Sequence, residues 1–192
     1  MTAELKVLFE GYVRGGEVDG ANHVGATASL ITAGDRVIVH DPGMCPGPEA
    51  LLGPLEVAGF HSGQVTDVIV SHHHPDHTRW MGLFALARVH DHWAVYDGDL
   101  WTSREAEGVE VVEGVTLMHT PGHTHEDITT LVTTPDGVVA LTHLWWDERS
   151  ESDPRAVDLD LLHTHRARVL ERADRIVPGH GHAFDVTDAT PR

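Results

Sequence analysis

The stretch His72-His-His-Pro-Asp-His77 is the most informative part of this sequence, because four of its six residues have side chains that can bind a metal in this pattern. These are His72, His74, Asp76 and His77, and they directly follow the apolar run Val-Thr-Asp-Val-Ile-Val-Ser at residues 65–71. A short apolar run of this kind predicts a buried strand. The motif therefore predicts a loop at the end of a strand that offers imidazole and carboxylate groups to a divalent metal.

The spacing within this loop indicates two metal positions. His72 and His74 are two residues apart, so their side chains share a face of an extended segment. Pro75 bends the chain before Asp76 and His77, which can then face a second point nearby. Since one loop cannot surround an ion, the remaining ligands must come from other parts of the chain.

Three further histidines each stand just after a predicted strand: His123, His143 and His180. Loops at one edge of a sheet converge in space although they are distant in sequence. The simplest assignment gives each metal three ligands. His72, His74 and His123 hold the first, and Asp76, His77 and His180 hold the second.

Two of these histidines lie in related segments, Thr120-Pro-Gly-His-Thr-His125 and Val177-Pro-Gly-His-Gly-His182. The shared Pro-Gly-His-x-His core, each time after a strand, indicates two similar halves that present ligands from their strand ends. Gly122 and Gly179 are expected to allow tight backbone turns beside the ligands, because glycine adopts such turns at little steric cost.

The composition limits the class of protein. A chain of 192 residues is expected to form one domain, residues 1–192. Its net charge of −17 with histidine neutral disfavours long nucleic acids and favours a small-molecule substrate. The lone cysteine, Cys45, together with the absence of a recognisable leader or membrane span, predicts a cytoplasmic protein without a membrane partner. The oligomeric state stays open.

Hydrophobic periodicity and turn signals predict a mixture of strands and helices. Strands are predicted at residues 27–31, 36–40, 66–70, 93–96, 109–112, 115–119, 128–133, 137–141 and 175–177. Helices are predicted at residues 48–60, 78–89 and 159–172. Because each half combines strand pairs with a helix, the pattern indicates an α+β fold of two packed sheets with helices outside.

These motifs resemble those of the metallo-β-lactamase-fold hydrolase superfamily. The resemblance rests on the loop at residues 72–77, the two Pro-Gly-His segments, and the hairpin that ends Val37-Ile-Val-His-Asp41-Pro-Gly43. It implies an αββα sandwich of two mixed sheets with outer helices, a metal site at one edge, and hydrolysis by a metal-activated water. Asp41 matches an early aspartate of the family and is expected to hydrogen-bond one imidazole or the ligand loop.

One position departs from the family pattern. His143 stands where members commonly have an aspartate that bridges both metals, and an imidazole cannot bridge in this way while its other nitrogen stays hydrogen-bonded. True metallo-β-lactamases within the superfamily also lack this aspartate, so two metals remain feasible. Alternatively, His143 caps one metal, Asp147 reaches inward instead, or the second position is only partly occupied.

The predicted function is that of a zinc-dependent hydrolase acting on a small ester, lactone, thioester or amide. One or two Zn²⁺ ions are expected, although Mn²⁺ and Fe²⁺ accept the same ligands. Asp76 is expected to orient the nucleophile and to pass a proton to the leaving group. Trp80, Trp145 and Trp146 are candidates for an apolar substrate pocket.

Three alternative functions remain open from the sequence. The first is a non-haem iron oxygenase of the persulfide dioxygenase type, which usually needs a carboxylate where His143 stands. The second is a nucleic-acid-processing hydrolase, which the acidic charge disfavours. The third is a metal-binding protein without turnover, whose coordination shell would be closed to water.

Overall fold

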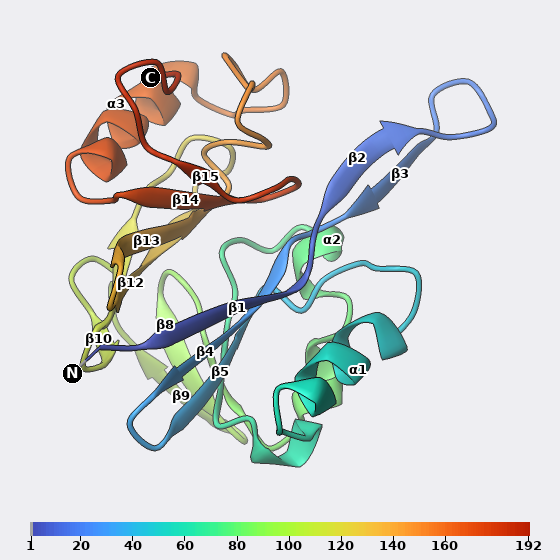
Figure 1. Ribbon diagram of the computed structural model, residues 1–192, viewed down its shortest axis with the longest axis vertical. Coiled ribbons are helices and arrows are strands. Elements are labelled where there is room, and N and C mark those ends of the chain that lie inside the picture. The colour runs from blue at the N-terminus through green and yellow to red at the C-terminus, as the bar shows by residue number, and fades with distance from the viewer. Residues whose placement is uncertain (1) are drawn as a thin grey trace.

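The computed structural model describes residues 2–192 as two mixed β-sheets packed face to face, with helices on the outer faces (Figure 1). This arrangement confirms the predicted α+β class and the αββα sandwich. The first sheet comes from the N-terminal half of the chain and the second from the C-terminal half.

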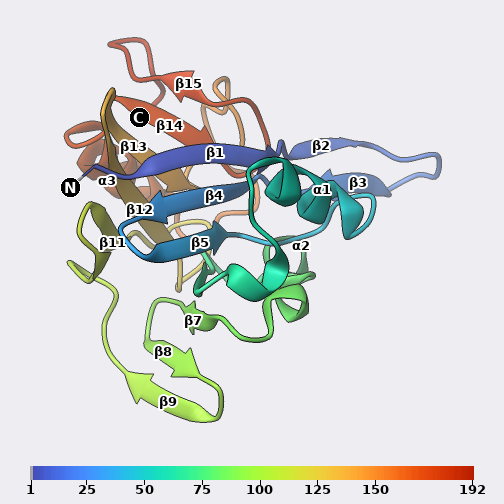
Figure 2. The same ribbon diagram turned by 60° about the horizontal axis from the view of Figure 1, so that its bottom comes forward.

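The first sheet has seven strands in the order β1-β4-β5-β6-β7-β8-β9. Strands β5, β6 and β7 are parallel to one another, and the other neighbours are antiparallel. The hairpin of β8 and β9 extends from one end of the molecule (Figure 2). The strands are β1 (Glu4–Phe9), β4 (Ala28–Ala33), β5 (Arg36–His40), β6 (Asp67–Ile69), β7 (Arg88–His90), β8 (Ala94–Asp97) and β9 (Leu100–Ser103).

The second sheet has six strands in the order β10-β11-β12-β13-β14-β15. Strand β12 is antiparallel to β11 and to β13, and β13 is parallel to β14. Strands β11, β13 and β14 therefore run in the same direction and end at the same edge. The strands are β10 (Glu110–Val112), β11 (Val115–His119), β12 (Ile128–Thr134), β13 (Gly137–Thr142), β14 (Arg175–Pro178) and β15 (Phe184–Asp185).

A separate hairpin projects from the body of the sandwich (Figure 1). It consists of β2 (Tyr12–Gly15) and β3 (Asn22–Gly25), which pair only with each other. The hairpin leaves the end of β1 and returns to the start of β4. Its base therefore lies beside the edge of the sandwich where the ligand loops are gathered.

Each outer face is covered by one longer helix. Helix α1 (Glu49–Val57) buries Leu55 against Leu30 and Val68 of the first sheet. Helix α3 (Leu159–Leu170) buries Leu162 and Val169 against the second. The shorter helices are α2 (Pro75–Thr78), η1 (Ser62–Gln64) and η2 (Met81–Phe84). Within residues 2–192, none of the helices has the length and apolarity needed to cross a bilayer.

The core between the sheets follows from the alternation of side chains along each strand. In β4, Leu30 faces α1 while Ile31 faces the second sheet. Ile31 is fully buried there with Leu117 and Leu141 of the opposite sheet. The strands are apolar on both faces because one face meets a helix and the other meets the second sheet.

The predicted helix at residues 78–89 is wrong. Helix α2 ends at Thr78, η2 is a single turn, and residues from Arg88 form β7 beside β6. Leu86, an apolar residue within this range, is 81% exposed. Parallel pairing with β6 overrides the local helical pattern, since propensity is weaker than tertiary pairing. Strands β1, β2, β3, β7, β9 and β15 had not been predicted.

Candidate metal centre

The seven predicted ligands meet at one edge of the sandwich, where strands of both sheets end. The first sheet contributes the segment after β6, in which Pro75 begins α2 and directs Asp76 and His77 inward. The second sheet contributes His123, His143 and His180, which follow the three strands that run in the same direction. Convergence at this edge is therefore a consequence of the strand order.

The two Pro-Gly-His segments do not mark two similar halves of the chain. They follow β11 and β14, which both belong to the second sheet. The first sheet presents its ligands through the quite different loop at residues 72–77. The prediction of a twofold repeat is therefore wrong, and the two segments are alike because they leave parallel strands at one edge.

Three imidazole nitrogens meet at one point of the cluster. His74 Nδ1 lies 3.0 Å from His72 Nε2 and 3.0 Å from His123 Nε2. Two nitrogens bound to one tetrahedral zinc ion at 2.0–2.1 Å are separated by about 3.3 Å. The two observed distances are close to this separation, so His72, His74 and His123 could share one ion.

A second group of ligands lies beside the first. Asp76 Oδ2 is 3.5 Å from His77 Nε2 and 3.6 Å from His180 Nε2. His180 Nε2 is also 3.1 Å from Nε2 of His143. The structure therefore gathers the two ligand sets that the sequence had proposed, with His143 between them.

Hydrogen bonds outside the cluster fix which nitrogen of His72 and His77 faces inward. Asp41 Oδ2 accepts hydrogen bonds from His77 Nδ1 at 2.8 Å and from the Ser71 hydroxyl at 2.7 Å. Because this hydroxyl donates to Asp41, it can only accept from His72 Nδ1, 3.0 Å away. Both rings thus turn their Nε2 atoms into the cluster.

His123 and His180 are held in the same way. His123 Nδ1 donates to Asp153 Oδ2 at 2.6 Å, and His180 Nδ1 donates to the carbonyl oxygen of Gly25 at 3.0 Å. Four rings therefore turn their Nε2 atoms into the cluster, where that of His77 is buried without a hydrogen-bond partner among the described residues. Outer hydrogen bonds of this kind orient metal-binding imidazoles. The donor set fits divalent metal.

Burial keeps most of these rings neutral, as metal binding requires. It lowers the pKa of His72 and His143 well below the usual value, with a further contribution from neighbouring histidines. Burial and the charge of His77 lower the pKa of His180 to about 4. Burial also opposes the charged form of His77, but the adjacent charge and hydrogen bond of Asp41 raise its pKa.

His143 differs from the other ligands. Its Nδ1 atom is buried without a hydrogen-bond partner among the described residues. Its ring stacks on that of His123 with centroids 4.1 Å apart. Its ligand atoms come within 4.8 Å both of the pair His72 and His123 and of the pair His77 and His180. The His143 ring thus lies between the two groups of possible ligands, but no acceptor among the described residues orients it.

These features match a known family. The family model for the metallo-beta-lactamase superfamily matches residues 22–186, which include every predicted ligand. The chain belongs to the metallo-beta-lactamase superfamily. The resemblance noted in the sequence is thereby confirmed.

Relatives in the superfamily share moderate identity with this chain. The frog (Xenopus laevis) metallo-beta-lactamase domain-containing protein 1 is 31% identical over 193 residues, covering 95% of this chain and 81% of its own length. Its human counterpart is 34% identical over 172 residues, covering 84% of this chain but only 64% of the human protein.

Solved structures of the superfamily share the fold at lower identity. A Thermotoga maritima member has a TM-score of 0.77 and 22% identity, covering 97% of this chain and all of the other. A dizinc quorum-quenching lactonase with the product N-hexanoyl-L-homoserine gives 0.68 and 15%, covering 90% and 80%. A protein in a di-iron-bound form gives 0.65 and 21%, covering 86% and 93%.

Asp147 does not replace the missing aspartate of the superfamily. It is exposed, and its Oδ1 atom accepts hydrogen bonds from Arg149 N and from the Ser150 hydroxyl, both at 2.9 Å. These bonds close a local turn and hold the carboxylate away from the ligands. The alternative in which Asp147 reaches inward is therefore wrong for this structure.

Gly122 and Gly179 serve close packing rather than tight turns, which corrects the sequence-based interpretation. Neither residue has a positive φ. A Cβ atom on Gly179 would lie 2.6 Å from Cδ2 of His143, and one on Gly122 would lie 2.7 Å from Cα of Leu162. Glycine is therefore required because the His143 ring and helix α3 approach the backbone closely.

Asp41 lies where the family resemblance had placed it. It directly follows β5, adopts a positive φ of 47°, and is buried. Besides His77, it binds the backbone nitrogen of Ser71 through Oδ1 at 2.7 Å. The neighbouring charges of His40 and His77 outweigh burial and lower the pKa of the Asp41 carboxyl. Asp41 thus joins the end of β5 to the ligand loop as a carboxylate.

Sequence reasoning missed Asp153, which orients His123. Asp153 is 1% exposed and lies in the segment without regular structure between β13 and α3. Hydrogen bonds from His123 and from Arg155 N lower the pKa of its carboxyl, against the opposing effect of burial. Thirty residues separate Asp153 from His123, and no motif joins them in the sequence.

Replacing Asp153 with asparagine should lower metal affinity by about 10- to 100-fold, because the imidazole loses its charged acceptor. Titration of metal-free protein with Zn²⁺ in competition with a chromophoric chelator measures this change. Asp158→Asn is the matched control, since Asp158 caps α3 through Leu161 N and asparagine caps equally well. Equal affinities for the two variants would contradict a role for Asp153 at the metal.

A cavity of about 520 Å³ opens over the cluster. Of the three predicted pocket tryptophans, only Trp146 lines it, with its ring 5.9 Å from that of His180. The other lining residues are Val13, Asn22, Val24, His74, Pro75, Asp76, His123, His143, Pro154, Arg155 and His180. The cavity thus lies between the β2–β3 hairpin and the segment that follows β13.

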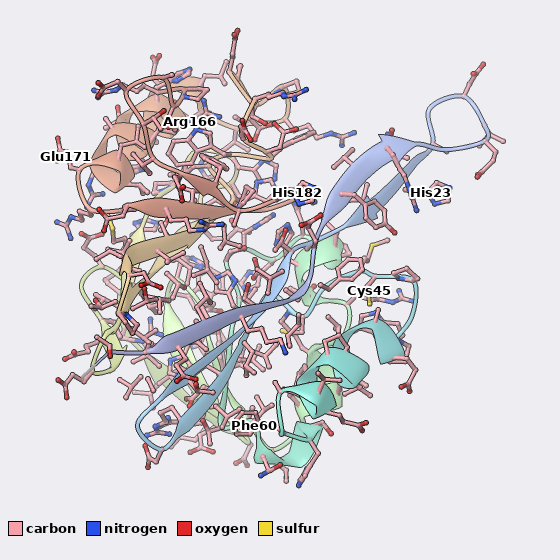
Figure 3. All side chains as sticks on the ribbon, viewed as in Figure 1. His23, Cys45, Phe60, Arg166, Glu171 and His182 are labelled. Carbon is pink, nitrogen blue, oxygen red and sulfur yellow. The ribbon has the colours of Figure 1, made fainter. Side chains whose placement is uncertain are left out.

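Trp145 and Trp80 do not line the cavity, and both predictions are wrong. Trp145 is fully buried beneath α3, donates a hydrogen bond to the carbonyl oxygen of Pro191, and lies 5.1 Å under the guanidinium of Arg166 (labelled in Figure 3). Trp80 follows α2, where the chain turns back and its backbone nitrogen binds the carbonyl oxygen of Pro42. Neither side chain is therefore placed to contact a substrate in the cavity.

Proposed function

We propose that this protein is a zinc-dependent hydrolase that cleaves a small-molecule ester, lactone, thioester or amide. The observation that carries the proposal is the inward orientation of four imidazole Nε2 atoms beside Asp76, beneath an open cavity. The superfamily to which the chain belongs and the lactonase with the same fold support this reaction class.

Three histidines, His72, His74 and His123, would hold one ion. Asp76, His77 and His180 would hold the second. When bound, such ions act as Lewis acids that lower the pKa of water to near 7 and polarise a carbonyl group. The proposed shell keeps room for water and substrate because the cavity reaches the ligands directly.

Asp76 is the residue we propose for proton transfer. It lines the cavity, and one of its oxygens faces His77 and His180. A carboxylate in this place can accept a hydrogen bond from the attacking water, take up its proton, and donate that proton to the leaving group. His143 would add a neutral nitrogen ligand between the two ions.

A small molecule is the substrate that fits this centre. The cavity of about 520 Å³ is of the size found for small-molecule sites. The net charge of −17 opposes the approach of a phosphate backbone. We further propose that the protein works in the reducing cytoplasm, where its single cysteine forms no internal disulfide.

Removal of metal should abolish hydrolysis. We expect chelation to lower the rate on a panel of 4-nitrophenyl esters, acyl lactones, thioesters and anilides by about 100-fold or more, because metal catalysis supplies several kcal/mol. Re-addition of Zn²⁺ should restore the rate. Elemental analysis of freshly purified protein should find one or two zinc ions per chain.

Several outcomes would contradict this proposal. Full activity without metal would exclude metal-dependent hydrolysis. Iron-rich protein that consumes oxygen with a persulfide would indicate the oxygenase alternative instead. RNA cleavage that weakens steeply with salt would indicate nucleic-acid processing. Bound metal with no exchangeable water would indicate a binding protein.

A further inference from the structure

Arg155 is a cation at the cavity over the metal centre. It lies in the segment between β13 and α3, and it lines the same cavity as His74, Asp76 and His123. Among the residues around this cavity it is the only arginine or lysine. Any anionic group that enters beside the proposed ligands therefore meets one guanidinium of opposite charge.

The backbone of Arg155 is tied to the metal site. Arg155 N donates to Asp153 Oδ1 at 2.8 Å, while Asp153 Oδ2 binds His123 at 2.6 Å. Further along the same segment, two backbone nitrogens bind the loop that carries His123. Val157 N donates to the carbonyl oxygen of His123, and Asp158 N donates to that of Gly122. These bonds fix the starting point of the Arg155 side chain relative to the ligand His123.

No carboxylate of the described residues forms an ion pair with the Arg155 guanidinium. Other arginines of this acidic chain do form such pairs, for example Arg88 with Asp67, Arg168 with Glu107 and Arg175 with Asp185. Arg155 is exposed, so its donors face water and the cavity. A guanidinium binds carboxylates in a two-point geometry.

The rest of the cavity wall is largely apolar. Val13 and Val24 come from the β2–β3 hairpin, and Trp146 and Pro154 come from the segment that carries Arg155. These side chains can bury a hydrocarbon portion of a ligand, while Arg155 binds a charged end. The metal ligands then lie against the bond to be cleaved.

We propose that Arg155 binds a substrate carboxylate, and that the natural substrate is an apolar acyl compound with this carboxylate remote from the scissile bond. The proposal rests on the proposed hydrolase function and adds a specificity-determining residue to it. In this proposal Arg155 contributes to substrate binding and specificity. It takes no part in the proton transfers assigned to Asp76.

A pair of esters with the same scissile bond tests this proposal. The probes are mono-4-nitrophenyl azelate, whose free carboxylate is too distant along the chain to attack the ester carbonyl, and its neutral methyl ester. In Arg155→Gln we expect kcat/KM for the anionic probe to fall about tenfold, as for a partly exposed charged hydrogen bond, and that for the neutral probe to stay unchanged. Arg155→Lys should retain part of the preference.

Arg149→Gln is the matched control. Arg149 lies a few residues earlier in the same segment but lines a neighbouring groove with Glu148 and Ser150 instead of the metal cavity. It should leave the ratio of kcat/KM for the two probes at the wild-type value. A similar fall of this ratio in both arginine variants would indicate general electrostatics and overturn the proposal.

Calorimetric binding to zinc-loaded protein separates this proposal from the hydrolase function. The probes are 5-phenylpentanoate and the neutral 5-phenylpentan-1-ol, neither of which contains a hydrolysable bond. Arg155→Gln should weaken only the carboxylate, by about tenfold. An unchanged affinity would overturn the role of Arg155 even if the esters are cleaved. Weaker carboxylate binding without ester cleavage would support it while contradicting the proposed reaction.

Discussion

Replacing His77 with alanine should remove one of two bound metal ions and lower hydrolytic activity by about 1000-fold. His77 is fully buried, and its Nε2 atom faces Asp76 without another hydrogen-bond partner. Loss of Lewis acidity worth several kcal/mol accounts for this magnitude, since each 1.36 kcal/mol changes a rate tenfold. Elemental analysis and steady-state kinetics on the same preparation measure both effects.

The same variant should also lose stability without any metal. His77 donates to Asp41, which is 3% exposed, so alanine leaves a buried carboxylate that keeps its hydrogen bonds from Ser71 and has only the buried imidazole of His40 nearby, at 3.6 Å. Removing one member of a buried charge pair costs about 3 kcal/mol or more. Urea unfolding of the metal-free proteins gives this loss separately from the loss of the ion.

His73 provides the control for His77 within the same loop. Its ring is partly exposed and lies 3.2 Å from Asp91 on the other side of the chain from the ligands. His73→Ala should keep the wild-type metal content and activity. If His77→Ala still binds two ions, or if both variants lose the same amount of metal, the proposed ligand set is wrong.

The ligands could be predicted from sequence because each belongs to a short local pattern. His72, His74 and His77 follow directly from β6, and two others follow a strand and a Pro-Gly pair. Strand ends collect at sheet edges, so the local signal also gives the approximate place in space. The αββα fold follows from the same alternation of strand pairs and helices.

Residues that act across the fold could not be predicted in this way. Asp153 and Arg155 lie in a segment without regular structure, where hydropathy has no period to detect. Their position depends on hydrogen bonds to the His123 loop. Trp145 and Trp146 show the same limit, because adjacent residues of one loop face the core and the cavity respectively.

Gly43→Ala should both destabilise the protein and disrupt the metal site. A Cβ atom on Gly43 would lie 1.6 Å from the carbonyl oxygen of Asp76 and 2.7 Å from Cα of His77. These are backbone atoms, so no change of rotamer can relieve the overlap. The next residue, Met44, donates its backbone nitrogen to the same Asp76 oxygen, which fixes the two segments together.

We expect this substitution to cost about 3 kcal/mol, at the upper end for overpacking, because α2 must move away from the loop after β5. Asp76 and His77 move with α2, so the affinity for the ion they hold should fall as well. Urea unfolding of metal-free protein and competitive zinc titration measure the two effects.

Gly47→Ala is the matched control, because Gly47 lies in the same loop as Gly43 but does not contact Asp76. A Cβ atom there would meet nothing within 4 Å, and this variant should keep the wild-type stability and zinc affinity. Equal losses for the two variants would show that loop flexibility, rather than contact with Asp76, matters. The expected difference would show that Asp41-Pro-Gly43 acts as a unit. Asp41 orients His77, and Gly43 leaves room for the backbone of Asp76 and His77 to lie against this segment.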